Sequence, residues 1–103
     1  MATALFVVKA TIDPDREEEF NRWYDDEHVP DLLRYPGAVS ARRYRSLVGE
    51  ERFQYMAVYE FRDQATLEAF LASDHLKALA RDYDARFGGA SQRQRFGYLQ
   101  VYP

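Results

Sequence analysis

The clearest pattern along the chain is a two-residue alternation in residues 52–61, where Phe53, Tyr55, Ala57, Tyr59 and Phe61 occupy every second position. Such an alternation predicts a β-strand. The apolar, β-branched stretch at the N-terminus, TALFVVKATI, predicts a strand buried on both faces. Two further strands are predicted, one over residues 38–47, which a hairpin joins to the alternating stretch, and one over residues 92–102.

Two segments between these strands have the spacing of helices. An Asp-Pro pair at residues 13–14 favours a helix start, and the acidic residues that follow suit the positive end of a helix dipole. We expect this helix to run to about His28, with a break at Pro30 and a short extra turn after it. The second helix is capped by Asp63 and ends at a pair of glycines. Its apolar spacing slips at residues 73–74, which predicts a kink or a restart there.

The order of these elements predicts one α+β domain over residues 1–103 with a ferredoxin-like β-α-β-β-α-β topology. In that arrangement a four-stranded antiparallel sheet carries both helices on one face, and its other face is bare. The third and fourth strands have apolar or aromatic residues on both faces, and an exposed patch of this kind normally marks an interface. We therefore expect a homodimer in which a second copy covers the bare face.

Composition and charge narrow the function. The chain is 47% hydrophobic and 16% aromatic, too rich in core-forming residues for a disordered protein. It has no apolar run long enough to cross a bilayer and no secretory signal, so we expect a cytoplasmic protein without a membrane partner. Its net charge of −3 argues against nucleic acid as a partner, because that binding needs a basic surface.

The first predicted helix carries ionisable groups on its apolar side. At about 100° per residue, Phe20, Trp23, Tyr24, Glu27 and His28 fall within an arc of roughly 140°. A carboxylate and an imidazole therefore face inward among three large rings. Buried ionisable groups cost free energy unless they find partners, and such breaks of pattern are expected at functional sites. Burial also shifts pKa values, which is useful for acid–base chemistry.

These residues predict a small-molecule pocket in which His28 and Tyr24 are catalytic. His28 would carry a proton, Tyr24 would donate a hydrogen bond to it, and Trp23 would form an apolar wall for the substrate. Glu27 either binds substrate there or bonds an arginine or the backbone near the helix end. The alternative for His28 is a structural role, as a hydrogen-bonded histidine in the core or at the end of the helix. His75 is either a solvent-facing residue at a helix start or a second acid–base group that reaches the same cavity.

The sequence predicts neither a metal nor a cofactor. Two histidines and no cysteine do not make a structural zinc site, and no HExxH spacing occurs. Glycine-rich phosphate loops and a serine nucleophile elbow are also absent. The arginine-rich runs at residues 42–45 and 93–95 are interpreted as solvated strand faces rather than anion sites.

Two segments resemble a known family. The run WYDDEHVP at residues 23–30, followed by YPG at residues 35–37, resembles the EthD-like family of dimeric α/β-barrel proteins, in which an aromatic pair precedes His-x-Pro and then Pro-Gly. The run FLASDHLKA at residues 70–78 is similar to the equivalent stretch of methylmuconolactone methylisomerase, a member of the wider group. The resemblance implies a homodimer whose two sheets form one barrel, with a pocket between sheet and helices in each subunit.

The resemblance also implies a class of activity. Relatives include cofactor-free isomerases, polyketide cyclases and monooxygenases that act on small aromatic or lactone-like molecules, and His28 matches their helix-one histidine. We therefore expect a cofactor-independent isomerase, cyclase or lyase that acts on a small cyclic or aromatic carbonyl compound. The alternatives are a ligand-binding or accessory protein without turnover, a cofactor-free monooxygenase, and a haem-binding barrel. An RNA-recognition domain of the same topology lacks support, because its glycine after the basic residue is missing and the chain is acidic.

Overall fold

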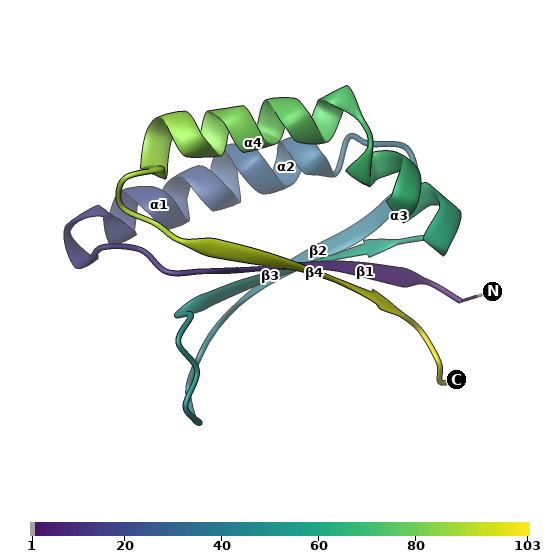
Figure 1. Cartoon of the computed structure of the whole chain (residues 1–103), viewed down its shortest axis with the longest axis horizontal. Coiled ribbons are helices and arrows are strands. Elements are labelled where there is room, and N and C mark those ends of the chain that lie inside the picture. The colour runs from purple at the N-terminus through teal and green to yellow at the C-terminus, as the bar shows by residue number, and fades with distance from the viewer. Residues whose placement is uncertain (1) are drawn as a thin grey trace.

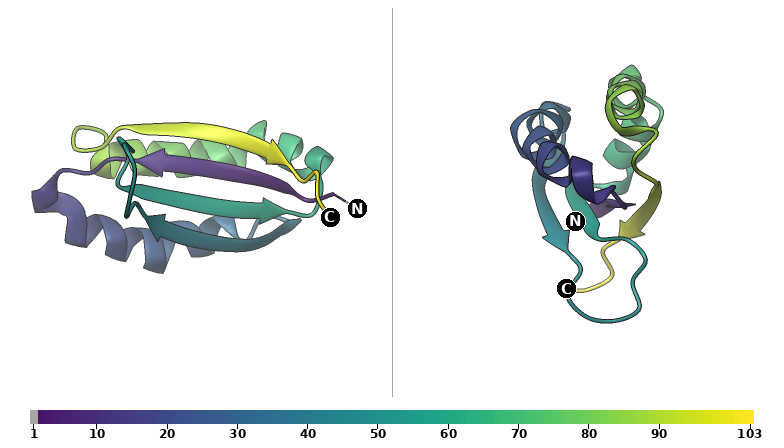
Figure 2. Two further views of the ribbon diagram at one scale, coloured as in Figure 1. Left: turned by 90° about the horizontal axis from the view of Figure 1, so that it is seen from below. Right: turned by 90° about the vertical axis from the view of Figure 1, so that its left-hand side faces the viewer.

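A computed structural model describes residues 2–103 as one antiparallel sheet covered by helices on one face (Figure 1). The strands lie in the order β2-β3-β1-β4, and every neighbouring pair is antiparallel. This arrangement confirms the predicted ferredoxin-like topology, and Figure 2 shows the sheet from its uncovered side. The strands are β1 (Ala4–Ala10), β2 (Ala38–Arg45), β3 (Tyr55–Phe61) and β4 (Arg93–Leu99).

The first helical segment is continuous but irregular. It opens with a 3₁₀ turn, η1 (Pro14–Arg16), and continues as α1 (Glu17–Trp23), the π turn η2 (Tyr24–His28) and α2 (Val29–Leu32). The predicted break at Pro30 is therefore wrong. The chain stays helical through the proline, because the distortion lies in the wider turn just before it.

The second helical region is divided where the sequence predicts. Its parts are α3 (Gln64–Leu71) and α4 (Asp74–Phe87). The Asp63 carboxylate accepts a hydrogen bond from the Thr66 N–H at 2.8 Å, and the Ser73 hydroxyl accepts one from the Leu76 N–H at 3.1 Å. Each helix thus has its own N-cap, which confirms both the cap and the restart.

The strands are shorter than their hydrophobic patterns. β1 ends at Ala10, because the backbone of Ile12 pairs instead with the Gln54 side-chain amide, through hydrogen bonds of 2.9 and 3.0 Å. The connection between β2 and β3 consequently spans residues 46–54 rather than a tight hairpin. An alternating sequence pattern shows which side chains are buried. Because that alternation extends beyond the last backbone hydrogen bonds of a strand, it predicts strands that are too long.

Large aromatic rings from both layers form the core. Phe20 of α1 is fully buried and packs edge-to-face on Phe87 of α4, with ring centroids 5.2 Å apart. Phe6 and Tyr59 reach the same layer from neighbouring strands and stack at 6.0 Å. Aromatic pairs of this kind contribute about 0.5–1.5 kcal/mol beyond their buried area. The rings thereby fix the helices at a set distance above the sheet.

The other face of the sheet is uncovered and apolar at its centre. Val7, Val58 and Phe96 lie side by side across three strands. The hairpin at residues 46–54 and the C-terminal segment both extend to this side (Figure 1). Within residues 2–103, no helix is both long enough and apolar enough to cross a membrane.

Candidate functional site

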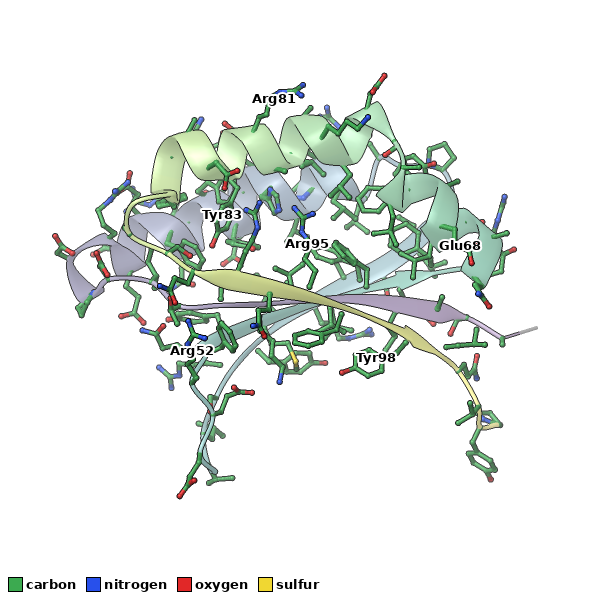
Figure 3. The ribbon with its side chains drawn as sticks, in the orientation of Figure 1. Arg52, Glu68, Arg81, Tyr83, Arg95 and Tyr98 are labelled. Atoms are coloured by element: carbon green, nitrogen blue, oxygen red, sulfur yellow. The ribbon has the colours of Figure 1, made fainter. Side chains whose placement is uncertain are left out.

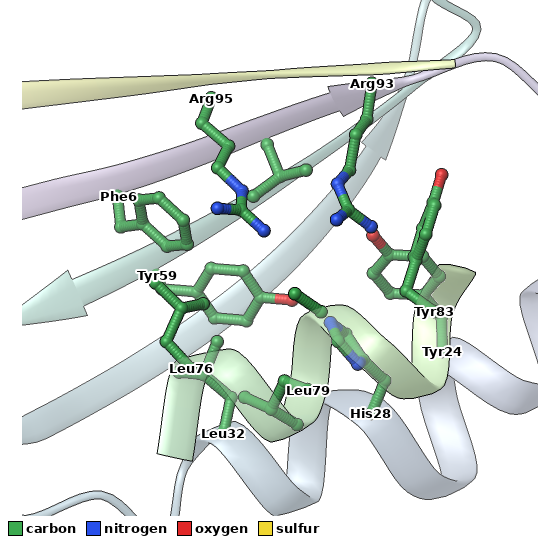
Figure 4. A pocket seen from close by; sticks show the side chains of 12 residues that line it. Phe6, Tyr24, His28, Leu32, Tyr59, Leu76, Leu79, Tyr83, Arg93 and Arg95 are labelled. Carbon is green, nitrogen blue, oxygen red and sulfur yellow. The ribbon is translucent and has the colours of Figure 1, made fainter. Parts of the chain in front are cut away.

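A small cavity lies between the sheet and the helices (Figure 4). Strands β1, β3 and β4 line one side, and the first helical segment and α4 line the other. The space between these side chains, including the part that opens to solvent, is about 310 Å³. Only about 20 Å³ of it is wide enough for the centre of a water molecule. That is room for about one water. The lining residues are Phe6, Val8, Tyr24, His28, Leu32, Tyr59, Leu76, Leu79, Ala80, Tyr83, Arg93 and Arg95.

The mouth of the cavity lies between α4 and β4. Arg95 is exposed and Arg93 and Ala80 are half-buried, whereas Phe6 and Tyr59 at the other end are buried. A ligand larger than water must therefore displace the arginine side chains as it enters. Arginine side chains are long and have many rotamers, so this displacement needs no change of backbone.

His28 reaches the cavity because the helix widens just before it. In the π turn, the Val29 N–H donates to the Tyr24 carbonyl, five residues back. Pro30 explains the widening, because it has no N–H and its ring would clash with the carbonyl four residues earlier in a regular α-helix. Such π turns are rare and are frequently found at functional sites.

The π turn also makes Trp23 and His28 neighbours on the helix surface. Their rings stack with centroids 4.5 Å apart and an interplanar angle of 30°. The Tyr24 ring meets the same imidazole at 4.9 Å and 69°. Trp23 thus backs His28 and does not line the cavity, so its predicted role as a wall in contact with substrate is wrong. Tyr24 does line the cavity, as predicted.

The His28 imidazole is neutral at pH 7. Burial is the main reason that its pKa falls to about 4, with Arg93 and Arg43 acting in the same direction and Asp82 and Asp31 opposing them. Its Nδ1 atom is buried and has no hydrogen-bond partner among residues 2–103. In a neutral imidazole one nitrogen donates and the other accepts. The ring therefore retains one donor and one acceptor, and its Nδ1 atom uses neither role within residues 2–103.

Two tyrosines add neutral hydroxyl groups. The Tyr59 hydroxyl is buried without a partner in the described part of the chain, and burial raises its pKa well above the usual value. Burial likewise raises the pKa of Tyr24. Within residues 2–103 the Tyr24 hydroxyl forms no hydrogen bond to His28, so that predicted contact is wrong. Tyr24 meets the imidazole with its ring, whereas the hydroxyl that is both fully buried and unpartnered within residues 2–103 belongs to Tyr59.

Two arginines bring positive charge to the cavity. Arg93 and Arg95 alternate with Gln94 on β4, and their side chains turn to the helical side of the sheet (Figure 3 and Figure 4). Arg93 lies over the Tyr83 ring at 4.0 Å and pairs with Asp84 at 3.5 Å. Gln94 and Arg95 are exposed, as the interpretation of this run as a solvated strand face expects, but Arg93 is half-buried and both arginines lie at the cavity.

Glu27 does not share the site with His28. Its side chain is 57% exposed, and its Oε1 atom lies 3.6 Å from Arg86 Nη2 on α4. The prediction that Glu27 faces inward and binds substrate is wrong because it assumed 100° per residue throughout. A π turn rotates each residue by a smaller angle, which moves Glu27 off the buried face and brings His28 toward its centre. The alternative, an ion pair with an arginine, is the observed one.

His75 also lies outside the cavity. Its Nε2–H donates to the Asp31 carbonyl at 2.9 Å, and its ring packs against Tyr35 at 5.8 Å. The restart of the helix at Ser73 points this side chain toward α2 rather than toward the sheet. The second acid–base role predicted for His75 is therefore wrong, and the residue joins α4 to α2 near the start of α4.

Sequence reasoning missed three residues that the structure brings to His28: Tyr59, Arg93 and Arg95. The alternation along β3 already turns Tyr59 inward, but nothing in it marks the hydroxyl as unpartnered. The i, i+2 spacing of the arginines was visible, yet which face they share depends on the register with β1, where Arg95 lies opposite Val8 and Arg93 opposite Ala10. Among residues 2–103, His, Asp and Glu side chains form no group of three that could hold a metal ion.

A protein-family model described as a domain of unknown function, DUF4286, matches residues 3–95. The chain belongs to the DUF4286 family. Among curated proteins, none matches this DUF4286 protein. The family match spans the cavity from β1 to Arg95, so the site described above lies within the region that defines the family.

Solved structures share the fold of this DUF4286 protein over nearly its whole length. An EthD family protein from Bacillus halodurans is 21% identical, with a TM-score of 0.67 over 93% of this chain and 97% of the other. A DABB family protein with a ferredoxin-like fold from Mesorhizobium loti is 16% identical, with a TM-score of 0.72 over 99% and 100%. SnoaB, a cofactor-independent oxygenase from Streptomyces nogalater, is 18% identical, with a TM-score of 0.66 over 98% and 95%.

These likenesses confirm the predicted fold, which the chain shares with an EthD family protein. At such identities they establish the fold alone. One of the three carries out oxygenase chemistry without a cofactor, so this fold supports that kind of enzyme.

Proposed function

We propose that this protein is a cofactor-independent enzyme in which His28 moves a proton next to the carbonyl of a small cyclic or aromatic compound. The reaction is of the isomerase, cyclase or lyase type. The observation that carries the proposal is a neutral, half-buried imidazole at the wall of a cavity, whose Nδ1 atom is buried and has no partner within residues 2–103. A core histidine with a purely structural role would be expected to satisfy both ring nitrogens.

The proton balance of this step fits the groups present. Neutral His28 takes a proton from the carbon beside the carbonyl, which leaves an imidazolium and an enolate. The Tyr59 hydroxyl stays protonated, because burial raises its pKa, and it donates a hydrogen bond to the enolate oxygen. In a substrate whose enolate is conjugated with a second carbon–carbon double bond, return of the proton to the far carbon of that system gives an isomer. The Trp23 ring, stacked behind the imidazole, holds it in one orientation during both transfers.

Proton exchange with solvent tests the step without knowledge of the full reaction. Small aromatic ketones and lactones are incubated in D₂O with the protein, and loss of the proton beside the carbonyl is followed by NMR. We expect the wild-type protein to accelerate exchange for at least one compound and His28→Ala to lower that rate by about 10²–10⁴-fold. Glu27→Gln, on the same helix outside the cavity, is the matched control and should exchange at the wild-type rate.

Two results would decide against this proposal. If His28→Ala catalyses exchange as fast as the wild-type protein, His28 is not the proton carrier. If compounds that stabilise the folded protein show no exchange at all, the cavity binds ligands without turnover, which is the accessory-protein alternative.

We also propose that a second copy of the chain covers the bare sheet face. The apolar centre at Val7, Val58 and Phe96 is flanked by a hairpin and a C-terminal segment that extend to the same side and carry exposed apolar side chains, Leu47 and Tyr102 among them (Figure 1). One partner sheet would bury the centre and both flanks together.

Light scattering after size exclusion tests the homodimer. We expect the mass of two chains for the wild-type protein and of one chain for Val58→Lys, because the new charge would be buried at the centre of the contact. Ala78→Lys, on the exposed side of α4, is the control and should stay dimeric. A wild-type mass of one chain at micromolar concentration would contradict the proposal.

A further inference from the structure

The cavity carries more positive charge than its surroundings neutralise. Its lining contains Arg93 and Arg95 but neither aspartate nor glutamate, although the chain as a whole has a net charge of −3. Arg93 is paired with Asp84 outside the cavity. Arg95 forms no ion pair with any carboxylate of residues 2–103, so one guanidinium group at the mouth is left without a counter-charge.

The guanidinium group of Arg95 is partly withdrawn from water. The side chain is exposed along the strand, but its guanidinium group turns into the space between the two layers (Figure 3). Partial burial there, together with the charge of Arg93, lowers the pKa of Arg95. Bulk water lies on the outer side of the same edge strand and would solvate the group better. An orientation that costs free energy in the free protein is expected at binding sites, where the ligand supplies the missing partner.

The donors converge in a way that suits a carboxylate. Arg93 and Arg95 stand two residues apart on one face of β4, which places their backbones about 7 Å apart. Guanidinium groups bind carboxylates through two parallel hydrogen bonds. The Tyr59 hydroxyl lies at the buried end of the same cavity, has no partner within residues 2–103, and is left for the carbonyl oxygen of the ring (Figure 4). The rest of the lining is apolar or aromatic and suits a ring.

We propose that the substrate of this cavity is a small ring compound that bears a carboxylate, and that Arg95, supported by Arg93, binds the carboxylate at the mouth. This inference rests on the proposed function insofar as it names the substrate class of the same site. The ring then lies inward against Phe6 and Leu79, within reach of His28. On binding, Arg95 moves from the cavity to the ligand, which opens the space that its guanidinium group occupies in the free protein.

Benzoate and benzamide test the charge directly, because they have nearly the same shape and differ in the carboxylate. Binding is measured by calorimetry and by the rise in melting temperature with ligand concentration. We expect benzoate to bind the wild-type protein about 10–100-fold more tightly than benzamide, the range expected for a charge-assisted pair. Arg95→Met should abolish this preference, and Arg95→Lys should retain part of it.

Arg81→Met is the matched control, because Arg81 points away from the sheet on the outer side of α4 and its removal changes the net charge equally (Figure 3). It should keep the full preference. Equal binding of benzoate and benzamide by the wild-type protein would overturn the inference, whether or not the variants fold. A preference that survives in Arg95→Met would also overturn it.

The His28→Ala variant separates this inference from the proposed function. If it binds benzoate like the wild-type protein and fails in proton exchange, both stand. If the wild-type protein catalyses exchange without preferring the anion, the proposed function stands and the carboxylate assignment falls. If anion binding is normal and His28→Ala exchanges as fast as the wild-type protein, the carboxylate assignment stands alone.

Discussion

Replacement of His28 by phenylalanine should change how the stability of the protein depends on pH. The folded protein holds this imidazole at a pKa of about 4, against 6.5 for the unperturbed group. The unfolded chain therefore binds the proton at a higher pH than the folded one. The resulting stability is fully present above pH 6.5 and is lost as the pH falls toward 4.

The size of the effect follows from these two pKa values. Between pH 7.5 and pH 5, preferential protonation of the unfolded chain at His28 should cost about 2 kcal/mol of the free energy of unfolding. His28→Phe keeps a ring to stack on Trp23 but has no proton to bind, so it should lose about 2 kcal/mol less than the wild-type protein over this range. The charged groups that face His28, namely Arg93, Arg43, Asp82 and Asp31, are present in both proteins and cancel in the comparison.

Urea unfolding followed by tryptophan fluorescence at pH 7.5 and pH 5 measures the difference, at one fixed protein concentration so that association does not enter. With a slope typical of small domains, 2 kcal/mol moves the urea midpoint by about 1 M. His28→Gln, which also cannot titrate, should behave like His28→Phe. Parallel pH dependence of the wild-type protein and both variants would refute the reasoning, because the imidazole would then titrate alike in the folded and unfolded chains.

Three further predictions concern the scaffold. Gly37→Ala should lower the free energy of unfolding in urea by about 1–3 kcal/mol, because Gly37 has φ +97° and an added Cβ would strike the Thr66 side chain. The control Gly49→Ala, at φ +94° in open space, should lower it by less. Equal losses in the two variants would argue against the clash. Asp63→Ala should cost about 1 kcal/mol through loss of the α3 cap, and Asp63→Asn should restore most of it. Glu27→Gln should change stability by less than about 1 kcal/mol, since its ion pair with Arg86 is exposed; a larger loss would show that the pair is not a surface one.

Much of the fold could be predicted because it follows from the burial pattern of single elements. The alternation in β3 and the polar interruption at Ser73 are local signals, and both have the predicted effect. The ends of the strands could not be predicted in this way. Whether β1 continues to Ile12 depends on the Gln54 side chain, which is distant in the sequence and competes for the same backbone groups.

The candidate site was predictable only in part. His28 stood out because an imidazole among aromatic residues breaks the helix pattern, and the structure places it at the cavity. Glu27 was misplaced by the same argument, because the π turn changes the angle between successive residues and Pro30 was its only visible sign. Arg95 needed the register of β4 against β1, and strand register is a property of the assembled sheet.

The wide turn at Tyr24–His28 amounts to one additional residue inside an otherwise ordinary helix. Pro30 holds this additional residue in the turn, because its ring would clash in a regular α-helical turn. Replacement of Pro30 by alanine would let the same residues wind regularly, which would change the positions of Glu27 and His28 on the helix surface. The architecture of this chain can therefore stay the same while one proline decides where its imidazole points.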